Sequence, residues 1–126
     1  MAMDELKQVV KSTVRSLNDT VAPPAEWART GPAWLAVEAL KPYLRAIGDP
    51  KRVFILHELA AAGERTVLEL AALLGLSQPL TSWHLHILKR ARLVAPTRRG
   101  RQIVYRLDSD RMREWRTQFD ALMRLS

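Results

Sequence analysis

The sequence predicts a mainly α-helical domain with one small β-hairpin, and three observations support this fold class. Apolar residues recur at the spacing of one helix face through most of the chain. Two helical segments are joined by a short turn at Gly75, which is a helix-turn-helix arrangement. At residues 103–107 the pattern changes to β-branched and aromatic residues, which favour a strand.

The 126 residues are expected to form an N-terminal helix with a linker, residues 1–31, and one domain, residues 32–126. The N-terminal helix is predicted over residues 4–20, with one narrow apolar stripe: Leu6, Val9, Val10, Val14 and Leu17. Residues 18–32 predict the linker because they are rich in Pro and Gly. The next helix runs from Pro32 to about Ile47, and Pro42 should kink or split it.

Asp49 and Pro50 predict the start of a helix at residues 50–62, since Asp caps helices and Pro fits their first turn. We expect this helix to be the most buried, because much of its surface is apolar: Val53, Phe54, Ile55, Leu56, Leu59 and Ala60. Thr66 and Glu69 have the spacing of a capping box, which begins a helix that stops at Gly75.

Ser77 and Pro79 predict the start of the second helix of the helix-turn-helix, residues 77–91. A short apolar run at residues 93–94 and the strand at 103–107 flank the turn at 98–101, so we expect a β-hairpin with a basic tip. Asp108 then caps a last helix with one apolar stripe: Met112, Trp115, Phe119, Leu122 and Met123.

The net charge of +7 is concentrated in one stretch of the chain. Between Glu69 and Asp108 there is no acidic residue, but there are seven basic ones: Lys89, Arg90, Arg92, Arg98, Arg99, Arg101 and Arg106. The other 13 Lys and Arg are balanced by the 13 Asp and Glu. A segregated basic block on an otherwise neutral protein indicates a polyanionic partner, most often nucleic acid.

Helix 77–91 has the two faces of a DNA recognition helix. Thr81, Leu85 and Leu88 share the apolar face, and Gln78, Ser82, His86 and Lys89 share a polar face that can bind base edges or phosphates. Trp83 has two interpretations, contact with a thymine methyl or sugar and packing against the hairpin. The residues expected to contact DNA are Ser77, Gln78, Thr81, Ser82, Trp83, His86, Lys89, Arg90, Arg98, Arg99 and Arg101.

Composition argues against several other classes of protein. There is no apolar run of the roughly 20 residues that a membrane span requires. There is no cysteine, which removes disulfides and thiolate metal sites, and a cytoplasmic location is the default expectation, nucleoid-associated when bound to DNA. No phosphate-binding loop, nucleophile elbow or metal motif is present, so we expect no enzyme activity and no cofactor.

The segment Ala46-Ile47-Gly48-Asp49-Pro50-Lys51-Arg52, the helix-turn-helix at 69–94 and the basic hairpin at 98–107 together resemble the ArsR-type winged helix-turn-helix repressors. The resemblance covers roughly residues 33–120. It implies a homodimer that binds double-stranded DNA at a pseudo-palindromic operator, with helix 77–91 in the major groove, the hairpin as a wing, and the helix at 4–20 extending the interface. The interface residues it implies are Trp34, Val37, Leu44, Met112, Trp115, Phe119 and Leu122.

The chain departs from this family at the positions where many members bind metals. The stretch 68–72 holds no thiol, and the last helix has Asp108, Asp110 and Asp120 but no histidine. His84 and His86 are two residues apart on a helix, so they do not readily chelate one ion. His57 is expected to be a hydrogen-bonded structural residue. A metal shared across the dimer, an organic effector, no effector and control by protein abundance all stay open.

Sequence-specific DNA binding by a homodimeric repressor is therefore the expected function. The alternative is a winged-helix module that binds other proteins or DNA without operator specificity, which would bind different duplexes equally. RNA is disfavoured because the major groove of an A-form helix does not admit a recognition helix.

Overall fold

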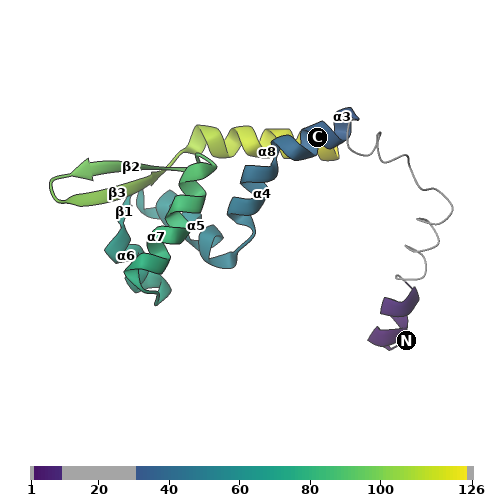
Figure 1. Ribbon diagram of the computed structural model, residues 1–126, viewed down its shortest axis with the longest axis horizontal. Coiled ribbons are helices and arrows are strands. Elements are labelled where there is room, and N and C mark those ends of the chain that lie inside the picture. The colour runs from purple at the N-terminus through teal and green to yellow at the C-terminus, as the bar shows by residue number, and fades with distance from the viewer. Residues whose placement is uncertain (1, 10–30, 125–126) are drawn as a thin grey trace. The chain divides into compact units, whose positions relative to one another are not determined.

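The computed structural model describes residues 2–9 and 31–124 and divides the chain into two compact units, residues 1–35 and 36–126. In the first unit, residues 3–9 are helical and their apolar side chains are exposed. The remainder of the helix expected at 4–20, and the linker as far as residue 30, lie outside the described residues. Figure 1 labels the elements from α3 onward.

The helix expected from Pro32 to Ile47 is split in two, as the presence of Pro42 predicts. Helix α3 spans Pro32–Ala39 and α4 spans Lys41–Ile47, with Leu40 between them. Pro42 falls in the first turn of α4, where its missing N–H removes no helical hydrogen bond. The side chain of Leu40 is only 2% exposed, so the break between the helices is anchored in the core.

Helix α5, Pro50–Ala62, begins at the predicted cap: Asp49 accepts a hydrogen bond from the Lys51 N–H at 2.8 Å. Its buried residues are Arg52, Ile55, Leu56 and Leu59. The expectation that this helix is the most buried is wrong, because the equally long helix Gln78–Arg90 has five buried residues to its four. Two of the apolar residues that suggested it, Val53 and Phe54, are 47% and 37% exposed. The helix is covered on one side, and these two residues lie on the other.

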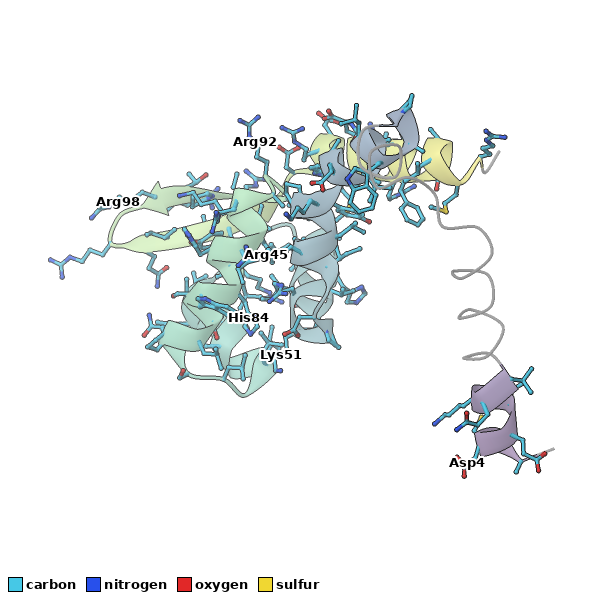
Figure 2. All side chains as sticks on the ribbon, turned by 45° about the vertical axis from the view of Figure 1, so that its right-hand side comes forward. Asp4, Arg45, Lys51, His84, Arg92 and Arg98 are labelled. Atoms are coloured by element: carbon cyan, nitrogen blue, oxygen red, sulfur yellow. The ribbon has the colours of Figure 1, made fainter. Side chains whose placement is uncertain are left out.

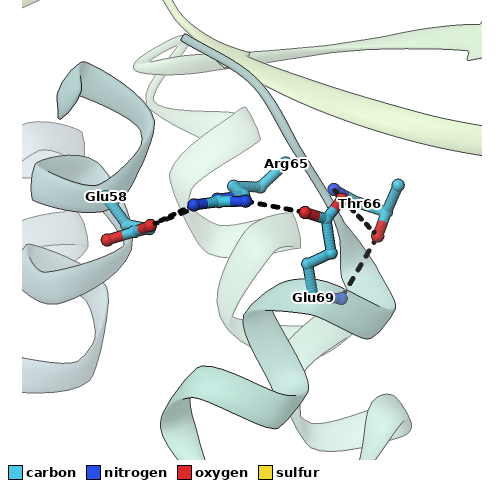
Figure 3. Close-up of polar contacts among 4 residues, drawn as sticks. All are labelled: Glu58, Arg65, Thr66 and Glu69. Carbon is cyan, nitrogen blue, oxygen red and sulfur yellow. Dashed lines mark hydrogen bonds and ion pairs between the residues drawn. The ribbon is translucent and has the colours of Figure 1, made fainter. Parts of the chain in front are cut away.

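Helices α6, Val67–Leu74, and α7, Gln78–Arg90, form the predicted helix-turn-helix. Thr66 and Glu69 make the complete capping box, with reciprocal side-chain to backbone hydrogen bonds of 3.1 Å (Figure 3). Gly75 takes the left-handed conformation, φ +65°, that ends α6. Ser77 then caps α7 by accepting from the Leu80 N–H.

The hairpin consists of β2, Val94–Arg99, and β3, Gln102–Leu107, and it extends away from the helices (Figure 1). Gly100 holds the first turn position with φ +62°, a conformation that suits glycine. A third strand, β1 at Arg65–Thr66, pairs antiparallel with β3 and gives the sheet order β1-β3-β2. The sequence does not predict β1, because two residues are too few for a periodic pattern.

Ion pairs join α5, β1 and α6. The Arg65 guanidinium contacts Glu58 of α5 at 2.9 Å and Glu69 of α6 at 2.8 Å (Figure 3). The hydrogen bonds to Glu69 and Glu58 raise the pKa of Arg65, and the bond from Arg65 lowers the pKa of Glu69. The Arg65 guanidinium in β1 therefore links α6 to α5.

Helix α8, Ser109–Met123, begins at Asp108, which accepts from the Arg111 N–H at 3.0 Å. Trp115 is the buried residue of this helix, 8% exposed. Its indole N–H donates to the Ala91 carbonyl at 3.3 Å, and its ring stacks on Tyr43 with centroids 5.6 Å apart. The assignment of Trp115 to a dimer interface is therefore corrected: its side chain is buried in the core of its own subunit.

Replacing Trp115 with Ala should lower the free energy of unfolding by about 3–5 kcal/mol, because it opens a cavity and removes a buried hydrogen bond. Urea denaturation followed by circular dichroism measures this decrease. Trp115→Phe, which keeps an aromatic ring but no donor, should be less destabilised. Arg116→Ala on the exposed side of the same helix should stay within about 0.5 kcal/mol of the parent. Equal midpoints for Trp115→Ala and the parent would contradict this assignment.

Candidate nucleic-acid interface

Helix α7 presents the polar face that the sequence predicts. Its buried residues are Thr81, His84, Leu85, Ile87 and Leu88, whereas Gln78, Ser82, His86, Lys89 and Arg90 are exposed. The side chain of Thr81 is 0% exposed, and its hydroxyl donates to the Ser77 carbonyl at 2.9 Å. Thr81 therefore supports the helix start from inside and is removed from the residues expected to contact DNA.

A groove of about 290 Å³ joins the polar face of α7 to the hairpin. Gln78 and Ser82 line it from α7, and Arg101 lines it from the turn of the hairpin. The start of α6 closes another side through Thr66, Val67 and Leu68. Residues of α7 and of the later hairpin thus share one surface, where amide and hydroxyl side chains and a cation lie together.

The wing arginines have an acidic partner outside the hairpin, Glu64, that sequence reasoning missed. Glu64 forms an ion pair with Arg99 and lies 3.9 Å from Arg106. The antiparallel register pairs Arg65 with Tyr105, so the preceding residue, Glu64, comes beside Arg106. Glu64 Oε2 is buried and accepts no hydrogen bond in the described part of the chain. The basic block is continuous in sequence, but one carboxylate partly neutralises it in space.

The other wing arginines differ from Arg99. Arg98 makes only a 3.4 Å contact with the Gly100 carbonyl, and Arg101 has no ion pair within the described residues. Both side chains are exposed at the tip of the hairpin, and Arg98 projects into solvent in Figure 2. Among the described residues, the wing arginines without an ion pair are therefore at its tip.

A buried arginine lies behind the recognition helix. Arg52 of α5, 7% exposed, donates to the Ala46 carbonyl at 2.7 Å and to the Arg45 carbonyl at 3.0 Å. Its Nη1 lies 3.1 Å from His84 Nδ1 on α7. A guanidinium only donates hydrogen bonds, so Nδ1 accepts and the proton of the neutral ring is on Nε2. One side chain thus ties the end of α4 to the middle of α7.

The ring of Trp83 packs against Arg52 and His84. Its ring lies 5.8 Å from the Arg52 guanidinium carbon and meets the His84 ring edge-on at 5.0 Å. The side chain is still 52% exposed beside the polar face of α7. The packing partners are Arg52 and His84, and the remaining ring surface is open to a ligand.

Burial lowers the pKa of His84 below its ordinary value of 6.5. Asp49 raises this pKa, whereas the charges of Arg52 and Lys51 lower it further. Asp49 is itself stabilised as an anion, chiefly by the hydrogen bond from the Lys51 N–H, which lowers its pKa. The histidine that supports α7 is therefore neutral, as its contact with Arg52 requires.

The other residues expected at a dimer interface differ in how far their side chains are exposed. Leu44 and Phe119 are 41% and 36% exposed, and Trp34 in the first unit is 41% exposed. Met112 and Leu122 are partly buried against the core, and Val37 is half-buried.

His57 is exposed and makes no hydrogen bond with the described residues, so its expected role as a bonded structural histidine is wrong.

Within residues 2–9 and 31–124, no group of three His, Cys, Asp or Glu side chains is arranged to hold a metal ion. None of the helices in the same ranges combines the length and apolar character needed to span a bilayer.

Comparison with known proteins gives one consistent group. Residues 49–95 match the profile described as "Bacterial regulatory protein, arsR family". The chain is 42% identical over 71 residues to the transcriptional repressor SmtB of Mycobacterium tuberculosis, a match that spans 56% of this chain and about half, 52%, of SmtB. It is 38% identical over 65 residues to the transcriptional repressor SdpR of Bacillus subtilis, covering 52% of this chain and 71% of SdpR.

The fold also matches solved structures. A homodimeric winged helix-turn-helix DNA-binding domain from Mycobacterium bovis, a possible ArsR-family regulator, superposes with a TM-score of 0.59. The two sequences are 27% identical, and the match covers 77% of this chain and 91% of that one. The predicted winged helix-turn-helix fold is therefore confirmed.

His84 should make the stability of the protein depend on pH. Because its pKa is lowered in the folded state, the unfolded chain binds a proton first as the pH falls through about 6.5. Unfolding is then favoured, and stability decreases between neutral pH and about pH 5. Urea denaturation across this range measures the slope.

The substitution His84→Gln, which retains an acceptor for Arg52, should flatten this slope relative to the parent. His57→Gln, which removes an exposed histidine, is the matched control and should retain it. If His84→Gln and the parent are destabilised equally as the pH falls, the buried histidine is not the source.

Proposed function

The chain belongs to the arsR family of bacterial regulatory proteins, and we propose that it is a cytoplasmic repressor that binds a specific operator in double-stranded DNA as a homodimer. The observation that carries this proposal is the shared groove of Gln78, Ser82 and Arg101. It combines amide and hydroxyl groups that can read base edges with a cation suited to the phosphate backbone.

The positions of the side chains support a proposed role for each. Gln78, Ser82 and His86 lie on the exposed face of α7 and would enter the major groove, where an amide binds adenine through two hydrogen bonds. Lys89 and Arg90 in the last turn would bind phosphates. Arg98 and Arg101 at the wing tip would contact the backbone or the minor groove.

A second copy of the chain is the proposed partner. Leu44, Phe119 and Met123 are 36% to 49% exposed on α4 and α8, and a monomer leaves this apolar surface in water. The Mycobacterium bovis relative with the same fold is described as homodimeric. In a two-fold dimer the paired α7 helices would reach half-sites about one DNA turn, roughly 34 Å, apart.

The proposal is tested by titrating the purified protein against the duplex upstream of its own gene and against a scrambled duplex of equal composition. We expect a preference of about 10³ or more for the native duplex. Gln78→Ala and Ser82→Ala should each reduce that preference, because a well-placed hydrogen bond to a base edge contributes about 1–3 kcal/mol of discrimination. Equal binding of both duplexes by the parent would instead support a module without operator specificity.

Glu64→Gln should strengthen binding to every duplex, because it releases Arg99 and Arg106 to bind phosphates. We expect a two- to fivefold gain in affinity, about 1 kcal/mol at most, and a steeper dependence on salt. Glu114→Gln, which removes an equal charge from an ion pair on α8, is the control and should have a smaller effect. If the two variants bind DNA alike, the Glu64 pair does not restrain the wing.

A further inference from the structure

A second cavity lies at the opposite end of the recognition helix from the DNA-reading groove. Its volume is about 350 Å³, within the range of about 300–1,000 Å³ that small-molecule sites occupy. The lining residues come from the end of α3, from α4 and from the last turn of α7: Glu38, Lys41, Pro42, Arg45, Ile87, Arg90 and Ala91. Figure 2 shows Arg45 between the two main walls, α4 and α7.

Three positive charges surround this cavity without a partner. Among the described residues, the side chains of Lys41, Arg45 and Arg90 form no ion pair and no hydrogen bond. Arg52, Arg65 and Arg99 of the second unit, by contrast, each form an ion pair with a carboxylate. Glu38 is the one acidic side chain in the lining, so the cavity has an excess of positive charge.

The other part of the lining is apolar. Pro42 of α4 lines the cavity with an exposed side chain, and Ile87 and Ala91 of α7, 7% and 3% exposed, add a small apolar area. An inorganic anion would use the cations and leave the exposed apolar surface of Pro42 in water. A ligand with a charged end and an apolar body would use both, because burying apolar area adds to the charge-assisted hydrogen bonds.

We propose that this cavity binds a small organic anion, a carboxylate or sulfonate on an aromatic or aliphatic body. The anionic group would lie among Lys41, Arg45 and Arg90, and the body would rest on Pro42 and on the exposed edges of Ile87 and Ala91. Arginine suits this role because its planar fork binds the oxygens of such groups in pairs.

The site has a consequence for DNA that rests on the proposed function. Arg90 lines the cavity and is also one of the residues expected to bind phosphate. An anion in the cavity occupies Arg90, so the ligand weakens DNA binding and reduces its salt slope by about one phosphate contact. By linkage, DNA weakens ligand binding by the same factor.

The site itself is tested without DNA, using fluorescence titration of the full chain. The probe is anilinonaphthalene sulfonate, and its uncharged analogue N-phenylnaphthylamine is the ligand control. Arg45→Gln should weaken sulfonate binding about tenfold, because it removes a charge-assisted hydrogen bond. Glu38→Gln should strengthen it about two- to fivefold by removing a repelling charge. Arg116→Gln, an equal charge change outside the cavity, should leave it unchanged.

Opposite effects of the two cavity variants, absent for the uncharged analogue, would establish the site. Equal sulfonate binding in the parent and all three variants would overturn it, because the dye would then bind exposed apolar surface. The proposed site would also be overturned if the uncharged analogue responded to the variants in the same way as the sulfonate. Circular dichroism confirms that each variant is folded.

A second arm separates this inference from the proposed function. Native-duplex affinity is measured with and without the sulfonate, in the parent and in Arg90→Gln. We expect the sulfonate to weaken binding by the parent and to have little effect on Arg90→Gln. If the dye does not bind but Arg45→Gln and Arg90→Gln both lower DNA affinity, the three cations serve phosphate, and the ligand site is wrong while DNA binding stands.

Discussion

The buried guanidinium of Arg52 joins three helices, α4, α5 and α7. The position of α7 in the domain depends on this connection. Arg52 donates to the Arg45 and Ala46 carbonyls at the end of α4, lies in α5, and reaches His84 in α7. A buried cation is costly unless its donors are satisfied, so this side chain admits few arrangements of the three helices. The helix cap at Asp49, 3.8 Å from Arg52, adds the nearby negative charge.

This constraint links the interior to both surfaces of α7. On one side, Gln78 and Ser82 meet the wing in a groove with Arg101. At the other end, Ile87 and Arg90 meet α4 in the cationic cavity. The helix is bonded to Arg52 at its middle and by Ser77 and Thr81 at its start. Glu64 forms an ion pair with Arg99 and so reduces the unpaired positive charge of the wing.

Local features of the fold were predictable from the sequence, and non-local ones were not. The caps at Asp49, Thr66, Ser77 and Asp108 and the break at Pro42 depend on neighbouring residues, and the structure confirms them. The Arg52–His84 and Glu64–Arg99 contacts join residues 32 and 35 positions apart, which no spacing reveals. An apolar stripe, as at Trp115, shows which side of a helix is buried but not whether its own subunit or a partner covers it.

The most direct test of this account is the operator preference of Arg52→Lys, measured without urea at a temperature where circular dichroism shows the variant to be folded. Lysine retains the charge but cannot donate to two carbonyls and His84 in the fixed geometry of the guanidinium. We predict a lower unfolding midpoint and a reduced preference for the native over the scrambled duplex, although no side chain of the DNA-facing surface has changed. An unchanged midpoint together with an unchanged preference would contradict the claim that Arg52 sets the position of the recognition helix.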